Sequence, residues 1–361
     1  MRRIALKDAK PNMQLAAPAY NDFGEMILDS DIYLRLEHVK LLVSKGVSRL
    51  IIEDSRVPDL ILSPLIPLHI QAEAIKAVFN MMKEVRAQKP GGATIAVQET
   101  AYAIAQQIEE SIMGDPDIMG TSSLKGYTYI HPVQSAITSM MLAKEAGYDH
   151  SDILRVGEAA MLQDIGYALI PQALIEKSGQ LTEAEDEELQ KHPQYAAQIL
   201  RQYSNVQPYT VDAVLQHHER WDGSGYPDRK KGWDIPPHAQ MVAIADTFCD
   251  LISKKPNRQP FSLSEAFEYI MAASGQLFDP ELVEVFARRI PMYPSGVMVQ
   301  LTSGEIGIVI APNIGQLGRP QVRICYQPNP RDASAPIPVN PPIDIDLSSS
   351  AYQQKLVAKL V

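Results

Sequence analysis

The chain has 361 residues, a length that accommodates about two domains of roughly 150 residues each. Hydrophobic residues make up 45% and charged residues 21% of the sequence, which is typical of a globular protein and excludes general disorder. The 33 basic and 43 acidic residues give a net charge of -10, which argues against a nucleic-acid polymer as partner but leaves room for a local basic pocket.

Neither the cysteine content nor the hydropathy pattern indicates secretion or a membrane segment. Two cysteines, Cys249 and Cys325, are too few for a disulfide framework and fit a reducing compartment. The longest apolar stretches, such as residues 241–245, are far shorter than the ~20 residues of a membrane-spanning helix. We therefore expect a cytoplasmic protein that does not enter a membrane.

Residues 1–68 are predicted to form a small α+β N-terminal unit followed by a linker. Short apolar runs on both sides of Gly24 predict strands joined by a turn. The apolar spacing from residue 34 to 42, followed by Gly46, predicts a helix with a glycine cap, and residues 47–53 predict a strand. Three prolines between residues 55 and 68 mark the linker.

Residues 69–290 have helical periodicity and predict a helical domain, so the fold class is mainly α. One helical stripe runs from residue 72 to 82, and a second helix is expected from about Thr94 towards Met113. Capping boxes predict helix starts at Thr182 and Ser262; the helix after Thr182 is expected to extend beyond His192. Asp279 followed by proline predicts a further start.

Residues 291–361 predict a short β-rich C-terminal segment. Strands are expected at residues 297–301, 307–310 and 322–326, separated by turns that contain glycine. The proline-rich stretch 328–342 predicts an extended loop, and residues 352–361 predict a short final helix.

Histidine and aspartate residues recur at the ends and on the faces of the predicted helices. His131 is expected just before a helix, Asp164 at the end of the helix 153–163, and Asp246 within a helix near residues 242 and 248. His192 lies inside a predicted helix, and His217 and His218 end another. Imidazole and carboxylate groups suit Fe, Mn or Zn, and a carboxylate can bridge two such ions. Taken singly, each residue is more often a satisfied core or capping group.

The loop HHERWDGSGYP at residues 217–227 is too distinctive for an ordinary turn, and it lies among other distinctive segments. Between about Gly126 and Arg258 the segments IHPVQSA, LQDIGYALIP, LTEAEDEELQKHP, HHERWDGSGYP and VAIADTF resemble, in this order, the HD-GYP family. Members of that family are bacterial metal-dependent phosphodiesterases that open cyclic di-GMP in a helical HD-type domain. The N-terminal unit and the segment YPSGVMVQLTSGEIGIVI resemble extensions that often flank this domain.

The resemblance implies roles for individual positions. His131 and Asp246 match ligands of a first ion, and Asp164 matches the catalytic aspartate of the HD pair, which bridges two ions. The implied ligands of the second ion are His192, His217 and His218. The signature loop that borders the substrate and contacts partner domains is matched by Gly225, Tyr226 and Pro227. Lys255 and Arg258 fall where the family places basic phosphate contacts.

Four positions depart from the family pattern. Gln163 replaces the histidine of the HD pair, and an amide oxygen is a poor ligand beside imidazole, so the first ion should bind more weakly. Tyr167 replaces a lysine aimed at the scissile phosphate, and Gln240 stands where arginine is common. Tyr127 replaces a glutamate that holds a third ion in some members. We expect one retained ion, Fe or Mn, one weakened ion, and slow or absent turnover.

Three interpretations stay open at this point. The chain is a divergent phosphodiesterase that still opens cyclic di-GMP, or it is a silent cyclic di-GMP receptor or adaptor. An adaptor would bind diguanylate cyclase (GGDEF) domains through the loop at Tyr226. In the third interpretation, the histidines and aspartates form only a polar helical core, although burying them without an ion or mutual hydrogen bonds is costly. The sequence leaves a homodimer open.

Overall fold

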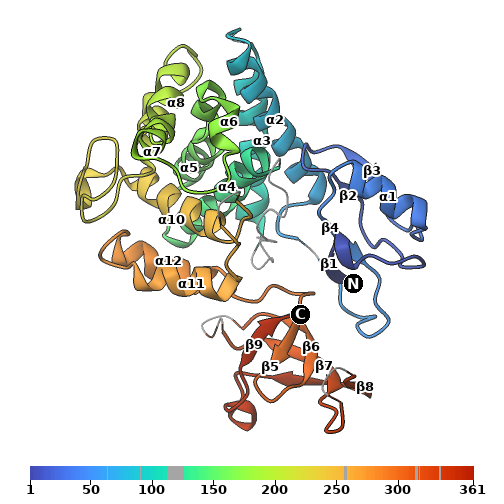
Figure 1. Ribbon diagram of the computed structural model, residues 1–361. Helices are drawn as coiled ribbons and strands as arrows, with labels where there is room; N and C mark the ends of the chain where they lie inside the picture. Colours follow the sequence, from blue (N-terminus) through green and yellow to red (C-terminus); the bar gives the residue numbers. More distant parts are fainter. Residues whose placement is uncertain are drawn as a thin grey trace.

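The computed structural model describes residues 1–62, 64–89, 91–111, 126–255, 258–313, 316, 318–332 and 335–361. Figure 1 shows three parts: an N-terminal α+β unit lies beside a large helical region, and a C-terminal sheet lies at one end of that region. The predicted fold class, mainly α with small β-containing segments at both ends, is confirmed.

The N-terminal unit is built from two strand pairs and one helix. Strand β1 (Arg2–Ala5) pairs antiparallel with β4 (Arg49–Ile52), and β2 (Ala19–Tyr20) pairs with β3 (Met26–Leu28). A short 3-10 turn η1 (Leu6–Asp8) follows β1, and helix α1 (Leu36–Ser44) ends before Gly46, as predicted. Leu15, Leu34 and Leu42 lie in its hydrophobic core.

The helical region surrounds one long, buried helix. Helix α4 (Tyr127–Glu145) is buried from Tyr129 to Ala143, and it packs against α2, α5 and α10. A helix that is buried all round forms the centre of a large core. The other helices are α2 (Leu68–Arg86), α3 (Ala93–Glu110), α5 (His150–Leu162), α6 (Gln172–Ile175), α7 (Glu183–Leu189), α8 (His192–Leu200), α9 (Pro208–Gln216), α10 (Pro237–Leu251), α11 (Leu263–Ala272) and α12 (Pro280–Arg289). Two 3-10 turns, η2 (Ile165–Leu169) and η3 (Gly232–Asp234), follow α5 and precede α10.

The three predicted helix starts are confirmed, but two other helix predictions are wrong. The side chains of Thr182, Ser262 and Asp279 cap α7, α11 and α12. His131 lies inside α4 rather than before it, because the helix already begins at Tyr127. The expected end of the second helix at Met113 lies outside the described residues.

The helix predicted to run through His192 is in fact two helices, α7 and α8. A continuous helix would need the N–H of residue 193 to bond to the Leu189 carbonyl, but residue 193 is proline. The His192 ring takes that carbonyl instead, with Nδ1 2.8 Å from the Leu189 oxygen. The break therefore places an imidazole ring at the start of α8.

The C-terminal segment is a five-stranded antiparallel sheet with the order β8-β7-β6-β5-β9. Its strands are β5 (Met298–Leu301), β6 (Ile306–Ala311), β7 (Gln321–Gln327), β8 (Ile337–Asp346) and β9 (Val357–Leu360), with the turn η4 (Ser350–Tyr352) before β9. The three predicted strands are confirmed. The loop predicted at 328–342 and the helix predicted at 352–361 are wrong in part, because both contain an edge strand.

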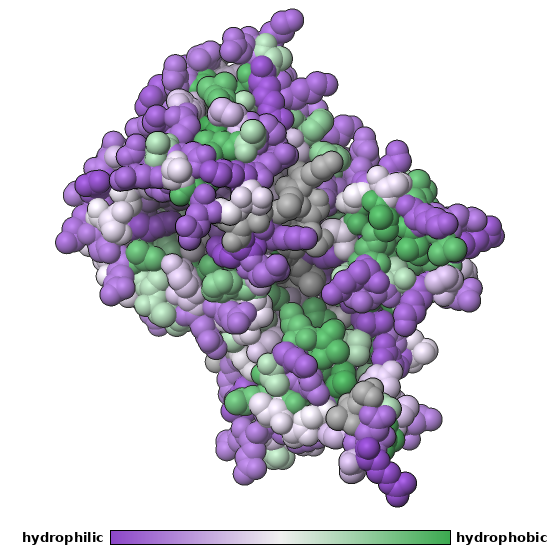
Figure 2. All heavy atoms as spheres, viewed as in Figure 1, coloured by the Kyte–Doolittle hydropathy of each residue, from purple (hydrophilic) through white to green (hydrophobic). Residues whose placement is uncertain are grey.

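Edge strands explain both errors. The prolines of β8 are tolerated because this strand pairs only with β7, so an N–H is needed on one side alone. The last residues form β9 because β5 offers an open edge to pair with. In Figure 2 hydrophilic side chains cover most of the visible face, with apolar patches over the N-terminal unit and the C-terminal sheet. Among the described helices, none combines the length and apolarity needed to cross a bilayer.

Candidate metal centre

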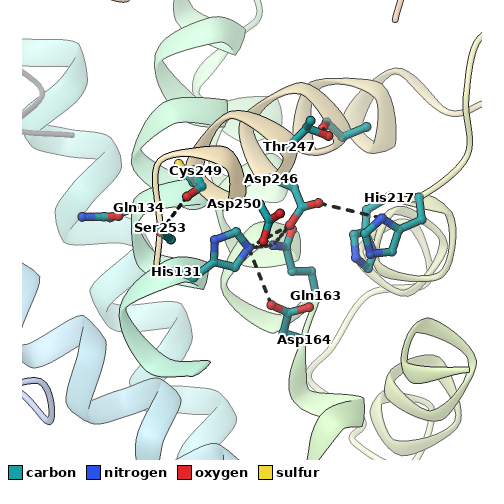
Figure 3. A network of polar contacts seen from close by, with 12 residues as sticks. His131, Gln134, Gln163, Asp164, His217, Asp246, Thr247, Cys249, Asp250 and Ser253 are labelled. Carbon is teal, nitrogen blue, oxygen red and sulfur yellow. Dashed lines mark hydrogen bonds and ion pairs between the residues drawn. The ribbon is translucent and has the colours of Figure 1, made fainter. Parts of the chain in front are cut away.

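The six residues implied as metal ligands lie together in the helical region, and Figure 3 shows most of them from close by. They form two groups, within each of which the ligand atoms lie within 4.8 Å of one another. The triple-histidine cluster consists of His192, His217 and His218. The carboxylate cluster consists of His131, Asp164 and Asp246. Five of the six residues are buried, and His218 is half-buried.

Both aspartates face both clusters. Asp164 places Oδ2 3.7 Å from Nε2 of His131 and Oδ1 3.5 Å from Nε2 of His192. Asp246 places Oδ1 2.8 Å from Nε2 of His131 and Oδ2 3.8 Å from Nδ1 of His218. Each carboxylate therefore stands where it can contact the ligand atoms of both groups.

Local sequence holds the two clusters next to each other. The turn η2, which follows Asp164, packs so tightly on α8 that a Cβ on Gly166 would overlap the His192 carbonyl oxygen. Only glycine fits there without displacing one element. The next residue, Tyr167, consequently stacks its ring on His192, with centroids 4.2 Å apart and planes inclined by 13°.

The triple-histidine cluster has the chemistry of a cation site. His192 and His217 donate from Nδ1 to the carbonyls of Leu189 (2.8 Å) and Val214 (2.7 Å), which leaves the Nε2 lone pairs free. These two Nε2 atoms lie only 3.4 Å apart. Burial lowers the pKa of His192 to about 3 and also lowers the pKa of His217, so both rings are neutral at pH 7. Two neutral acceptors that face each other fit a cation between or beside them.

In the carboxylate cluster, Asp246 is already engaged in hydrogen bonds, whereas Nδ1 of His131 and the amide oxygen of Gln163 have no partner among the described residues. Oδ1 of Asp246 accepts from Nε2 of His131 and from the Gln163 amide, both at 2.8 Å. Burial opposes ionisation of Asp246, but the His131 hydrogen bond and the nearby histidines outweigh it and lower the pKa of this carboxyl group. The ring nitrogen of His131 that would bind an ion is thus used as a donor, and this cluster fits an ion less well than the triple-histidine cluster does.

Asp164 differs from Asp246 because, among the residues that the structure describes, no hydrogen-bond donor lies at close range of its carboxylate. Burial is the main cause that raises the pKa of Asp164 to about 7, although His131 acts in the opposite direction. Such a carboxyl group gains most from a neighbouring cation, because its charge has little other compensation.

The signature loop is anchored beside the triple-histidine cluster. Gly225 lies against the backbone of residues 218–220, where a Cβ would overlap the His218 carbonyl oxygen. Tyr226 stacks on the His218 ring at 4.7 Å, and the buried Glu219 accepts from the backbone N–H of Asp228 (2.7 Å) and Lys230 (3.0 Å). A cavity of about 560 Å³ opens next to this loop, and its lining includes Arg220 and Arg229. Pro227 continues the loop after Tyr226.

Lys255 and Arg258, the two expected phosphate contacts, form ion pairs with Asp250, a residue that the sequence did not single out. Asp250 pairs with Lys255 and with Nη2 of Arg258 (3.1 Å), and it accepts from the Tyr127 hydroxyl at 2.6 Å. Asp250 follows Asp246 by four residues in α10, a spacing that puts both on one helix face and could have revealed it. Tyr127 also stacks on His131 at 4.7 Å.

Gln240 takes no part in either cluster. Its amide donates to the Ile235 carbonyl at 2.8 Å and so secures the turn before α10. Glu219, Arg220 and Arg229 were also missed, although all three lie in or next to the distinctive loop. Their roles depend on how the loop closes, which the motif alone does not state.

Comparisons with known proteins agree with this geometry. A family model described as HD domain matches residues 122–282. The "Cyclic di-GMP phosphodiesterase PA4108" of Pseudomonas aeruginosa is 29% identical over 292 residues, which are 79% of this chain and 67% of that protein. A "Cyclic di-GMP phosphodiesterase" of Thermotoga maritima is 38% identical over 162 residues, 45% of this chain and 44% of that protein.

The chain thus spans about two thirds of the first relative and less than half of the second. Among solved structures, Bd1817, "a HDG"Y"P protein from Bdellovibrio bacteriovorus", has a TM-score of 0.53 and 16% identity, over 79% of this chain and 97% of that one. This likeness shows a shared fold. Residues 122–282 thus match the HD domain family, and both ligand clusters and the GYP loop lie within this range.

Proposed function

We propose that the chain is a metal-dependent phosphodiesterase module that opens cyclic di-GMP. The observation that carries the proposal is the position of Asp164, whose two oxygens face His131 at 3.7 Å and His192 at 3.5 Å. A carboxylate between two ligand clusters is the arrangement that a metal-dependent hydrolase needs. The names of the two relatives support cyclic di-GMP as the substrate.

The triple-histidine cluster would hold the retained ion, with oxygens of Asp164 and Asp246 close by. Imidazole and carboxylate donors fit Fe or Mn, and a bound ion would supply a Lewis acid for the phosphodiester. The protein itself would position the substrate in the cavity beside the loop. There Tyr226 offers a ring face, and Arg220 and Arg229 offer positive charge.

We expect turnover to be slow for two reasons. Gln163 holds Asp246 by a hydrogen bond and offers no imidazole to an ion. Tyr167 places an uncharged ring on His192, where a cation would attract the scissile phosphate. Losing one preorganised hydrogen-bond donor to a transition state costs about 2.7–4 kcal/mol, and each 1.4 kcal/mol is about tenfold in rate.

A second candidate function is a cyclic di-GMP receptor, or an adaptor for GGDEF domains. It is favoured by the intact loop, in which Glu219 fixes the backbone and Gly225 permits the close turn around Tyr226. Such a module would keep the nucleotide cavity without turnover.

Chromatography of cyclic di-GMP incubated anaerobically with the Fe(II)- or Mn(II)-loaded chain tests both functions. We expect slow formation of linear dinucleotide by the wild type, at least tenfold faster formation by Gln163→His, and none by Asp164→Asn. Gln202→His makes the same chemical change at an exposed position and should leave the rate unchanged. Tight binding of cyclic di-GMP without product in any variant would favour the receptor, and two tightly held ions in the wild type would contradict a weakened first site.

A further inference from the structure

A second, much smaller cavity of about 10 Å³ lies at the base of the loop of residues 217–227. Residues of this loop line it together with residues of α10 and of the segment that leads into α12. A space of this size takes about one guest as large as a water molecule. The six residues of the two metal clusters do not line it, so the cavity needs an explanation of its own.

Three polar side chains of the lining are almost completely buried. Glu219, Gln240 and Asp279 are only 1%, 6% and 5% exposed. The rest of the lining is apolar or aromatic and consists of Trp221, Ile235, Ala243, Leu277 and Phe278. In such surroundings a polar atom without a partner, or a charge without an opposite charge, is costly.

The amide of Gln240 has a fixed orientation. Its Nε2 donates to the Ile235 carbonyl at 2.8 Å and to the Gly232 carbonyl at 3.4 Å. Because a carbonyl oxygen can only accept, reversing the amide would place oxygen against oxygen. Oε1 is therefore the free end of the amide, and it is buried without a hydrogen-bond partner among the described residues. A buried acceptor of this kind requires a donor or a cation.

The two acids of the lining receive hydrogen bonds from the backbone only. Glu219 accepts from two N–H groups of the loop, at 2.7 and 3.0 Å. Asp279 caps α12 with Oδ1, 2.8 Å from the Glu281 nitrogen, and within the described part of the chain its Oδ2 has no hydrogen bond. No lysine, arginine or histidine of the described ranges pairs with either carboxylate. The polar part of the lining therefore offers negative charge and lone pairs.

We infer that this cavity binds one calcium ion through side-chain oxygens of Glu219, Gln240 and Asp279. Carboxylate and amide oxygens are the ligands that Ca²⁺ prefers, and two carboxylates balance the charge of a divalent ion. Mg²⁺ usually keeps several water molecules, for which a cavity of about 10 Å³ has no room. A single water molecule could donate to Gln240, but it would leave both carboxylate charges without compensation.

A calcium ion at this place would tie three segments of the chain together. Glu219 belongs to the loop, Gln240 to α10, and Asp279 starts α12. The loop and the segment before α12 already touch through the backbone, since the Trp221 N–H donates to the Leu277 carbonyl at 3.0 Å. The ion would thus hold the base of the loop next to the triple-histidine cluster. This role does not require turnover, so its test is separate from that of the proposed function.

Calorimetric titration of the full chain, freed of metal by a chelator and dialysed, with calcium chloride tests the inference. We expect saturable binding with a dissociation constant of about 1 mM or lower. Asp279→Asn removes a ligand charge but keeps the helix cap, because asparagine caps as well as aspartate, and it should weaken binding at least tenfold. Asp149→Asn makes the same change at the exposed cap of α5 and should change the dissociation constant less than twofold. Loss of calcium binding in Asp164→Asn would place the ion in the metal centre and overturn the inference.

A second variant keeps the test decisive if Asp279→Asn disturbs folding. Gln240→Lys brings a fixed ammonium group, about as large as a water molecule, to the place of the ion. Calcium should raise the melting temperature of the wild type, because only the native state binds it, but not that of Gln240→Lys. An equal rise in both proteins would overturn the inference, and so would the absence of saturable heat in the wild type at millimolar calcium. Magnesium chloride is titrated in parallel, and binding as tight as that of calcium would overturn the assigned ion.

Discussion

The two ligand clusters share the same pair of aspartates, yet they differ in how their atoms are satisfied. In the triple-histidine cluster, backbone carbonyls fix the tautomers of His192 and His217 and leave two acceptors face to face at 3.4 Å. In the carboxylate cluster, Gln163 and His131 both donate to Asp246. The first arrangement presents two facing acceptors that would suit a cation, whereas in the second Asp246 already accepts hydrogen bonds from its neighbours. A ligand set can thus persist in composition while its ligand atoms are engaged elsewhere.

The largest expected effect comes from His217→Ala. This change removes one of the two facing Nε2 atoms, and we expect the affinity for the retained ion to fall by about 100-fold or more. Metal analysis after dialysis measures the loss. His69→Ala removes an exposed histidine and should leave the metal content unchanged. If the His217 variant kept its ion, the retained metal would belong to the carboxylate cluster, and the comparison would be reversed.

Gln163→Leu tests whether the hydrogen bond from the Gln163 amide to Asp246 stabilises the protein. The change removes a donor to a buried, ionised carboxylate. In protein freed of metal by a chelator, we expect the free energy of unfolding to fall by about 1.5–3 kcal/mol. Urea denaturation measures this loss. The exposed control Gln202→Leu should change stability by no more than about 0.5 kcal/mol. An unchanged stability for Gln163→Leu would mean that the amide is not needed to hold Asp246.

The clustering of the six candidate ligand residues could be predicted because they lie in local motifs whose order along the chain is distinctive. The hydrogen bond from Gln163 to Asp246 could not be predicted, because it joins residues 83 apart whose orientations depend on the packing of α5 against α10. The position of Asp250 beside Asp246 could have been predicted, since their spacing puts both on one face of α10. The role of Glu219 could not be predicted, because it depends on the path of the loop that follows this residue.

The fold errors have a similar physical origin. Proline content argued for a loop at 328–342, and apolar spacing argued for a helix at 352–361. Strands β8 and β9 form there because the sheet offers pairing at both of its edges. Tertiary pairing decides the conformation of an edge strand more than its own residues do.

In the protein freed of metal by a chelator, His192 and Asp164 should change the unfolding free energy with pH in opposite directions. The pKa of His192 falls to about 3 on folding, so below its ordinary value of about 6.5 the unfolded chain binds a proton that the native state does not. Stability therefore rises with pH from about 3 to 6.5, by at most about 1.4 kcal/mol per pH unit for this group. Asp164, with its pKa raised to about 7, acts in the opposite direction above its ordinary value of about 4.

Burial lowers the pKa of His217 and His218 as well, whereas the hydrogen bond to Asp246 outweighs burial and raises the pKa of His131. The three histidines of the triple-histidine cluster should outweigh Asp164 and His131, so the unfolding free energy should increase between pH 5 and 6.5. Urea denaturation across this range should give a steeper increase for Asp164→Asn and a shallower one for His192→Gln. Identical slopes in the two variants would show that these groups do not carry the pH dependence.

The smallest expected effect separates two tyrosines that stack on the two clusters. Tyr127→Phe keeps a ring over His131 but removes the 2.6 Å hydrogen bond to Asp250, which retains Lys255 and Arg258 as partners. We expect a loss of about 1 kcal/mol. Tyr167→Phe is the matched change over His192, and within the described part of the chain the Tyr167 hydroxyl has no hydrogen bond to lose. Its stability should stay within about 0.5 kcal/mol of the wild type. Equal losses would mean that stacking and burial, rather than the link to Asp250, hold the ring over the carboxylate cluster.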